Sequence, residues 1–162
     1  LAVCASAMIG AVAMAQDSTD NLSFRIGFDY PTKAATKAAA KDMVGFGFQK
    51  VIKVLDDAER YTTSFDVSVD VYSRGNYRHI PILANYVGTS KNGGTFWSAG
   101  AGLGFVKRPA GCGTESIGRI AYQVSVGMNF GKAEKAAFVE VKYWGSEATE
   151  LNALGVYLGF RF

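Results

Sequence analysis

The chain is poor in the residue types that most catalytic and metal sites need. Of its 162 residues, one is histidine, two are cysteine and three are proline. Cys112, between two glycines, has no further ligands beside it, so the sequence predicts no metal site. No nucleophile elbow or phosphate loop occurs. Residues 100–104 (Gly-x-Gly-x-Gly) are not a dinucleotide-binding motif, because no helical pattern follows them. We therefore expect no cofactor and no enzymatic activity.

Long apolar runs and basic clusters are also missing. After Ala15 no stretch of about 18 apolar residues occurs, so no transmembrane helix is expected. The formal net charge is only +3, and the basic residues are scattered along the chain. A nucleic-acid surface needs clustered Lys and Arg, so no nucleic-acid partner is expected.

The first 15 residues are apolar and end on Ala13-Met14-Ala15, before a polar stretch from Gln16. A short apolar run closed by a small-x-small pattern is typical of a secretory signal peptide. We expect residues 1–15 to be a signal peptide whose start precedes Leu1, and 16–162 to be one barrel domain. Lipidation at Cys4 is the weaker alternative, because Val3 is too bulky for the position before a lipidated cysteine.

The last residues alternate strictly between two kinds of side chain. Leu154, Val156, Leu158, Phe160 and Phe162 share one parity, and glycine, tyrosine and arginine fill the other. A period of two is that of a β-strand, whose successive side chains point to opposite faces. One wholly apolar face and one small or polar face suit a strand between lipid and a narrow polar interior.

The same alternation recurs about eight times. The predicted strands cover residues 22–30, 42–51, 61–72, 77–87, 95–107, 119–130, 135–145 and 154–162, and continuation of the second strand to Leu55 is an alternative. Turn signals separate them, and residues 109–118 are expected to form a glycine-rich loop. An even number of alternating antiparallel strands joined by short connections predicts an all-β fold, an eight-stranded antiparallel up-and-down transmembrane β-barrel.

The two parities differ sharply in charge. The apolar parity carries almost no formal charge, which a water-exposed sheet face would not omit over eight strands. The other parity carries charges of both signs, which a narrow interior tolerates only when they are paired. We therefore predict a lumen charge network, formed by Arg25, Asp66, Asp70, Glu140, Lys142 and Arg161.

Glycines and aromatic residues add two expectations. Glycines on the inward parity make room for long charged partners. Aromatic residues near strand ends are candidates for interfacial girdles, namely Tyr30, Tyr61, Tyr72, Tyr86, Trp97, Tyr143 and Trp144.

Three segments resemble the bacterial outer-membrane β-barrel family of eight-stranded OmpA/OmpX-like proteins. Ile80-Pro81-Ile82 leads into an alternating segment, Ser98 to Gly104 is similar to the family's glycine-rich central strand, and Leu158 to Phe162 is similar to its terminal strand. As a pattern, the resemblance covers residues 21–162. It implies location in the bacterial outer membrane, with membrane lipid as a partner. It also implies that Phe162 is part of the signal read by the barrel assembly machinery.

Three functional hypotheses follow. The first is a monomeric, non-enzymatic barrel of the porin type with a side-chain-filled lumen, serving envelope structure, surface interaction or limited small-solute passage. The second is a soluble periplasmic, lipocalin-like barrel with the apolar parity inside around a ligand. The third is a lipid-modifying enzyme that uses His79, which we otherwise interpret as a polar residue at a strand end.

Overall fold

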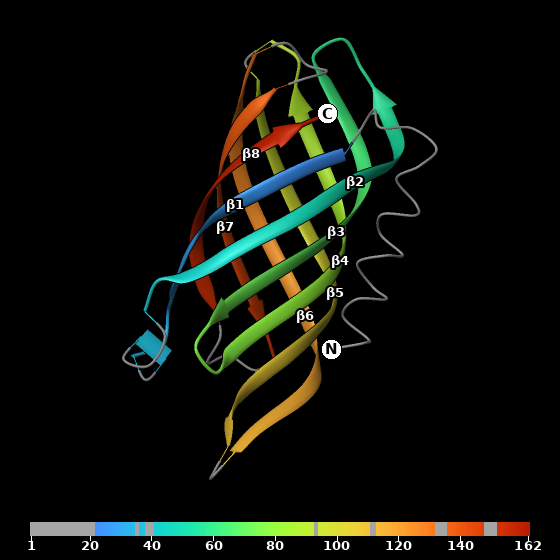
Figure 1. Cartoon of the computed structure of the whole chain (residues 1–162). Coiled ribbons are helices and arrows are strands. Elements are labelled where there is room, and N and C mark those ends of the chain that lie inside the picture. Colours follow the sequence, from blue (N-terminus) through green and yellow to red (C-terminus); the bar gives the residue numbers. More distant parts are fainter. Residues whose placement is uncertain are drawn as a thin grey trace.

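The computed structural model describes residues 22–34, 36–37, 41–92, 94–110, 113–131, 136–147 and 152–162. Eight strands close into a barrel in which each strand pairs with its neighbours in the chain and β1 pairs with β8 (Figure 1). The strands are β1 (Leu22–Pro31), β2 (Met43–Asp57), β3 (Tyr61–Arg74), β4 (Tyr77–Ser90), β5 (Thr95–Ala110), β6 (Gly113–Phe130), β7 (Ala137–Ser146) and β8 (Ala153–Arg161). All pairs are antiparallel, so the predicted fold is confirmed. No helix among the described residues is long and apolar enough to cross a membrane.

The up-and-down order gives the barrel two distinct ends. The β1–β2, β3–β4, β5–β6 and β7–β8 connections lie at one end, where the β5–β6 hairpin projects; we name it the hairpin end. The start of β1 and the end of β8 lie at the other, the terminal end. At the hairpin end Gly75 turns the chain with a φ of +56°, a conformation that favours glycine. Closure brings residues far apart in sequence together, as in the Arg25–Gly159 pair of β1 and β8.

One predicted boundary is wrong, and one strand ends two residues beyond the alternative continuation to Leu55. Residues 109–118 belong to the β5–β6 hairpin, whose ladder continues to the Ala110–Gly113 pair, instead of forming a loop. β2 continues past Val51 to Asp57, with register shifts after Val51 and Val54. Both segments extend past the barrel wall, where most side chains are exposed, although Ile117 packs against the buried cluster that includes Tyr72 and Val106. Backbone pairing persists there without the alternation on which the prediction relied.

Pro81 is accommodated by an interruption of one ladder. The β3–β4 register runs to the Val69–Ile82 pair and resumes at Tyr72–His79, with no residue inserted. Toward β5, the Pro81–Gly104 pair stays in register. A proline has no N–H to donate, so it is tolerated where one side of the strand lacks regular pairing.

The apolar parity faces outward, as predicted. Its side chains are exposed all round the barrel, among them Ile26, Phe28, Phe48, Leu103, Ile120, Val126, Val156 and Leu158. The outward positions of β1, β3, β6, β7 and β8 carry no Asp, Glu, Lys or Arg. Two of the predicted girdle aromatics are misplaced, because Tyr72 and Trp144 are fully buried in the lumen. Both stand on the inward parity.

Candidate functional site

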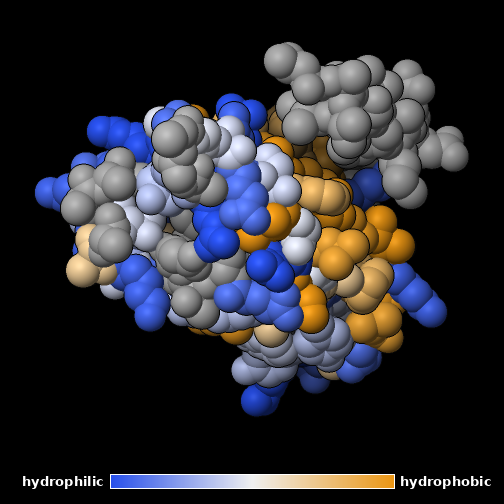
Figure 2. All heavy atoms as spheres, turned by 90° about the horizontal axis from the view of Figure 1, so that it is seen from below, coloured by the Kyte–Doolittle hydropathy of each residue, from blue (hydrophilic) through white to orange (hydrophobic). Residues whose placement is uncertain are grey.

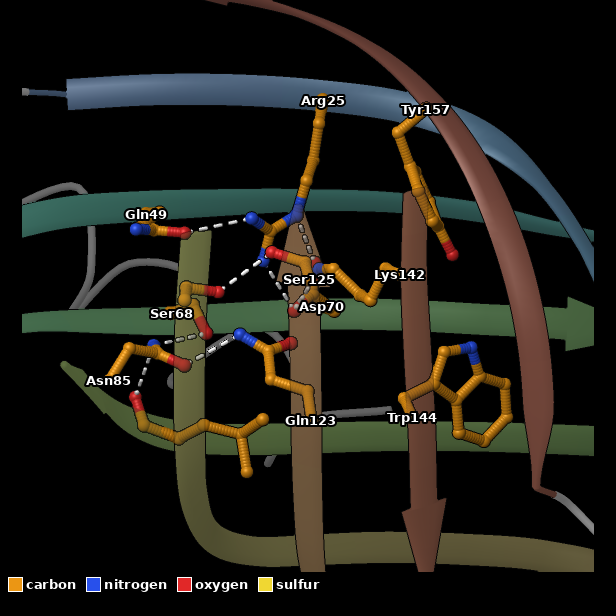
Figure 3. A network of polar contacts seen from close by, with 12 residues as sticks. Arg25, Gln49, Ser68, Asp70, Asn85, Gln123, Ser125, Lys142, Trp144 and Tyr157 are labelled. Atoms are coloured by element: carbon orange, nitrogen blue, oxygen red, sulfur yellow. Dashed lines mark hydrogen bonds and ion pairs between the residues drawn. The ribbon is translucent and has the colours of Figure 1, made fainter. Parts of the chain in front are cut away.

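A buried ion cluster lies at the centre of the lumen (Figure 3). Arg25 of β1 donates from Nε to Asp70 Oδ1 at 2.8 Å and from Nη2 to Asp70 Oδ2 at 2.7 Å, a bidentate pair across to β3. Its Nη1 lies 2.8 Å from Gln49 Oε1 and 3.4 Å from Glu140 Oε2 on β7. Arg25 and Glu140 are each 2% exposed and Asp70 is 0% exposed. The planar guanidinium thus joins three strands that are not neighbours in sequence.

Lys142 completes the ion cluster. Its Nζ lies 3.5 Å from Asp70 Oδ2 and 5.1 Å from the centre of the Tyr157 ring, and the residue is fully buried. Two cations, Arg25 and Lys142, therefore face two carboxylates, Asp70 and Glu140. Balanced charges of this kind are what a low-dielectric interior requires, because an unpaired buried charge is costly.

The other two residues of the predicted network lie apart from this ion cluster. Asp66 accepts hydrogen bonds from Gln49 Nε2 at 2.7 Å and Ser64 Oγ at 2.6 Å, so Gln49 links it to Arg25. The Arg161 guanidinium lies 5.0 Å and 5.6 Å from the ring centres of Phe96 and Phe138 near the terminal end. The structure thus brings Arg25, Asp70, Glu140 and Lys142 together in one ion cluster. Asp66 is linked to Arg25 through the side-chain amide of Gln49. It places Arg161 on aromatic rings.

A neutral polar chain lies beside the ion cluster, between β3, β4 and β6 (Figure 3). Gln123 Nε2 donates to Asn85 Oδ1 at 2.6 Å, and Asn85 Nδ2 donates to Ser68 Oγ at 2.9 Å. The hydroxyls of Ser98 and Ser125 lie 2.8 Å apart. These buried polar groups fill the lumen with side chains and hydrogen-bond to one another, while Gln123 Oε1 has no partner among the described residues.

Toward the hairpin end the lumen is closed by aromatic rings, an arrangement the sequence did not reveal. Trp144 stacks on Tyr72 with centroids 4.2 Å apart and an interplanar angle of 7°. Its Nε1 donates to Asp29 Oδ1 at 2.7 Å, and Tyr157 OH donates to the same oxygen. The inward parity of Asp29, Trp144 and Tyr157 was the available signal, but parity alone does not show which inward residues meet.

His79 belongs to this aromatic group. It is fully buried, and its ring centroid lies 4.9 Å from that of Trp144 and 6.0 Å from that of Tyr72. It is the third residue of β4, so it lies near a strand end as expected, but its side chain is buried in the lumen. The His79 side chain therefore faces the lumen and not the outer face of the barrel.

Inward glycines provide the room for these long side chains. Gly47 pairs with Arg25 on one side and Asp70 on the other, and a Cβ there would overlap Asp70 Oδ1. Gly100 stands between Asn85 and Gln123, and a Cβ there would overlap Asn85 Oδ1. The glycine parity seen in the sequence therefore reflects close contact between neighbouring strands and charged or amide side chains.

We predict that Gly47→Ala lowers the free energy of unfolding by about 1–3 kcal/mol, because the added methyl displaces the Asp70 carboxylate from Arg25. Gly118→Ala is the matched control, since a Cβ at that exposed strand position meets nothing within 4 Å. It should change stability by less than about 0.5 kcal/mol. Urea unfolding of the refolded proteins in lipid vesicles measures both. Equal effects of the two substitutions would contradict the steric role of Gly47.

The contacts in the described lumen are ion pairs and hydrogen bonds. The parts of the chain that the structure describes contain no group of three or more His, Cys, Asp or Glu side chains placed to hold a metal ion. Cys4 and Cys112 lie outside the described residues. What the arrangement does is hold opposite charges across the barrel and fill the space between the strands.

No family model matches the sequence, and no curated protein matches it significantly. Two solved structures share the fold. The N-terminal β-barrel domain of Pseudomonas aeruginosa OprF matches with a TM-score of 0.55 and 14% identity, over 88% of this chain and 98% of that one. The outer-membrane enzyme PagL matches with a TM-score of 0.54 and 11% identity, over the same 88% and 98%.

The match to PagL corrects one expectation. The sequence pattern predicts that the chain is not an enzyme. That prediction is wrong, because an outer-membrane enzyme has this same fold. Fold does not determine function, so the barrel leaves catalysis open. What the two matches do establish is architecture: the predicted resemblance is confirmed, and the chain has the fold of the eight-stranded outer-membrane β-barrels.

Proposed function

We propose that the chain is an integral protein of the bacterial outer membrane whose lumen is closed by its own side chains. Its role is in envelope structure or surface interaction, with at most restricted passage of small solutes. Membrane lipid surrounds it, and it acts as a monomer. The remaining expected partner is the barrel assembly machinery, which would engage β8 and the aromatic pair Phe160 and Phe162.

The observation that carries this proposal is the separation of apolar and charged side chains by the barrel wall. Val126 and Leu158 on the outside are 61% and 66% exposed, whereas Arg25, Asp66 and Asp70 on the inside are at most 3% exposed. Soluble monomers rarely expose continuous apolar surface of more than a few hundred Å². A belt over all eight strands matches the hydrocarbon layer of a membrane instead.

The soluble alternative requires the opposite orientation. A lipocalin-like barrel would hold Phe46, Val126 and Leu158 inside and present Arg25 and Asp70 to water. The structure has the reverse, with these apolar side chains outside and the charged ones inside, which disfavours a lumen built for an apolar ligand. The lipid-embedded barrel is therefore the function class that the burial pattern favours.

The closed lumen supports the structural part of the proposal. The ion cluster and the Asn85–Gln123 chain occupy the middle, and the Trp144–Tyr72 stack occupies the hairpin side. An eight-stranded barrel has an interior just wide enough for side chains to fill. Steady passage of ions would require the Arg25–Asp70 pair to separate.

The first experiment is gel migration of the refolded protein, unheated and boiled, after folding in detergent. We expect different migration of the two samples, β-rich circular dichroism only with detergent present, and no steady conductance in planar bilayers. Folding in plain buffer without a migration shift would contradict membrane insertion. A large steady conductance would contradict the closed lumen while leaving insertion intact.

A further inference from the structure

A row of polar donors crosses four strands on the outer face near the hairpin end. Ser73 of β3 pairs with Arg78 of β4, Arg78 pairs with Lys107 of β5, and Lys107 pairs with Ser116 of β6. All four positions share the parity of the apolar belt, so their side chains leave the barrel wall on its outer side. We name these four residues the donor row.

The donor row sets two cations directly opposite each other. Side chains at paired positions start about 5 Å apart, and like charges there repel. Arg78 and Lys107 are exposed, and within the described residues no carboxylate lies within ion-pair distance of either. A shared anion would turn this repulsion into attraction.

The terminal end carries one exposed ion pair near the β3–β2 rim. Lys91 Nζ lies 2.7 Å from Asp57 Oδ1. The hydrogen bond from Lys91, aided by one from Thr62, holds the pKa of the Asp57 carboxyl below its ordinary value.

The donor row stands directly at the edge of the apolar belt. Two residues along each strand toward the barrel middle, the outer face carries the Ile80–Phe105 pair, and Phe105 is 54% exposed. Two residues of a strand span about 7 Å. Arg78 and Lys107 therefore lie about the depth of a lipid headgroup layer closer to the hairpin end than Ile80 and Phe105 do. Figure 2, which views the hairpin end, shows hydrophilic residues gathered there beside the apolar flank of the barrel.

We propose that Arg78 and Lys107 bind the phosphate of a membrane lipid headgroup, with Ser73 and Ser116 as flanking hydroxyl groups. The planar guanidinium and the ammonium suit phosphate oxygens, and hydrogen bonds between ionised groups are strong. The acyl chains of the same lipid then lie along Ile80 and Phe105. This assignment rests on the proposed membrane insertion, because only a bilayer places a lipid phosphate at this level.

The test measures lipid selectivity of the protein refolded in phosphatidylcholine vesicles. Spin-labelled phosphatidic acid and spin-labelled phosphatidylcholine report the relative association of the two headgroups. We expect a preference of about thirtyfold for phosphatidic acid, since each of the two basic residues contributes about 1 kcal/mol near a membrane surface. The double variant Arg78→Gln/Lys107→Gln should lose most of this preference.

The matched control is Lys33→Gln/Lys37→Gln, which removes the same charge from exposed positions at the same end. It should keep the preference. Loss of preference in both double variants, or in neither, would overturn a specific site. Inorganic phosphate should weaken the preference no more than chloride of equal ionic strength. A phosphate-specific loss would assign the pair to a soluble anion and overturn the lipid assignment.

Gel migration in phosphatidylcholine alone separates this proposal from the one on which it rests. A wild-type protein without a heat-dependent shift would overturn membrane insertion and the lipid site together. A protein that shifts but shows no headgroup preference would overturn the lipid site alone.

Discussion

Arg25→Leu should lower the free energy of unfolding by about 3–5 kcal/mol, the cost of leaving a buried counter-charge unpaired. Arg25 makes both hydrogen bonds to Asp70 and also lies 3.4 Å from Glu140. Without it, two buried carboxylates share only Lys142, whose Nζ is 3.5 Å from Asp70. The ion cluster of Arg25, Asp70, Glu140 and Lys142 then has one excess negative charge.

A double-mutant cycle identifies the cause of this loss. Arg25→Leu/Asp70→Leu removes both partners, so the double variant should be more stable than the sum of the two single losses allows. The control is Arg161→Leu, because Arg161 lies over the rings of Phe96 and Phe138 and makes no ion pair within the described residues. It should cost about 1 kcal/mol. Urea unfolding in vesicles measures all four proteins.

Two results would contradict the role of the ion cluster. One is an Arg25→Leu loss no larger than the Arg161→Leu loss. The other is strict additivity of Arg25→Leu and Asp70→Leu, which would mean that the two side chains contribute independently despite their 2.7 Å contact.

The strands were predictable because their alternation is local. Residues 154–162 alone show which side chains share a face, and Leu158 and Phe160 are outward as expected. The β5–β6 hairpin was not predictable, because residues 109–118 pair outside the barrel, where no burial pattern marks a strand. The period-two alternation of apolar residues arises only where one face of a strand is buried. It gives no signal where solvent contacts both faces of a paired strand.

Contacts inside the lumen depend on information that no single strand contains. Arg25 and Asp70 are 45 residues apart in the sequence. They meet only because the registers of β1, β2 and β3 place both side chains at the same level along the barrel axis. Arg161 has the same parity as Arg25 but stands nearer the terminal end, beside Phe96 and Phe138. Parity predicts which side of the wall a residue occupies. The stagger of all eight strands decides its partner.

Trp144 shows the limit of reasoning from residue type. Tryptophans near strand ends favour membrane interfaces, which led to its assignment as a girdle residue. Its position on the inward parity, shared with Glu140 and Lys142, predicted the opposite. The structure follows parity, because the indole fills the lumen and its N–H finds Asp29. Within a barrel, the alternation of faces outweighs the preference of a single side chain.

Leu158→Arg should lower the free energy of unfolding by about 2–4 kcal/mol in a bilayer, the cost of placing an arginine near the midplane on the lipid side. Leu158 is 66% exposed and lies between Ile26 of β1 and Val139 of β7, which are both outward and apolar. Its side chain fills no interior space, so the loss measures lipid contact and not packing.

Leu55→Arg is the matched control, because it makes the same chemical change at another exposed leucine. Leu55 is 47% exposed on the part of β2 that extends past the barrel, and Asp56 and Asp57 follow it. An arginine at this position remains in contact with water, so the free energy of unfolding should change by less than about 0.5 kcal/mol. Urea unfolding in vesicles of both variants compares the two sites. A Leu158→Arg protein as stable as the Leu55→Arg protein would place the belt in water. A difference of several kcal/mol would fix the exposed parity of β8 as the surface that lipid covers.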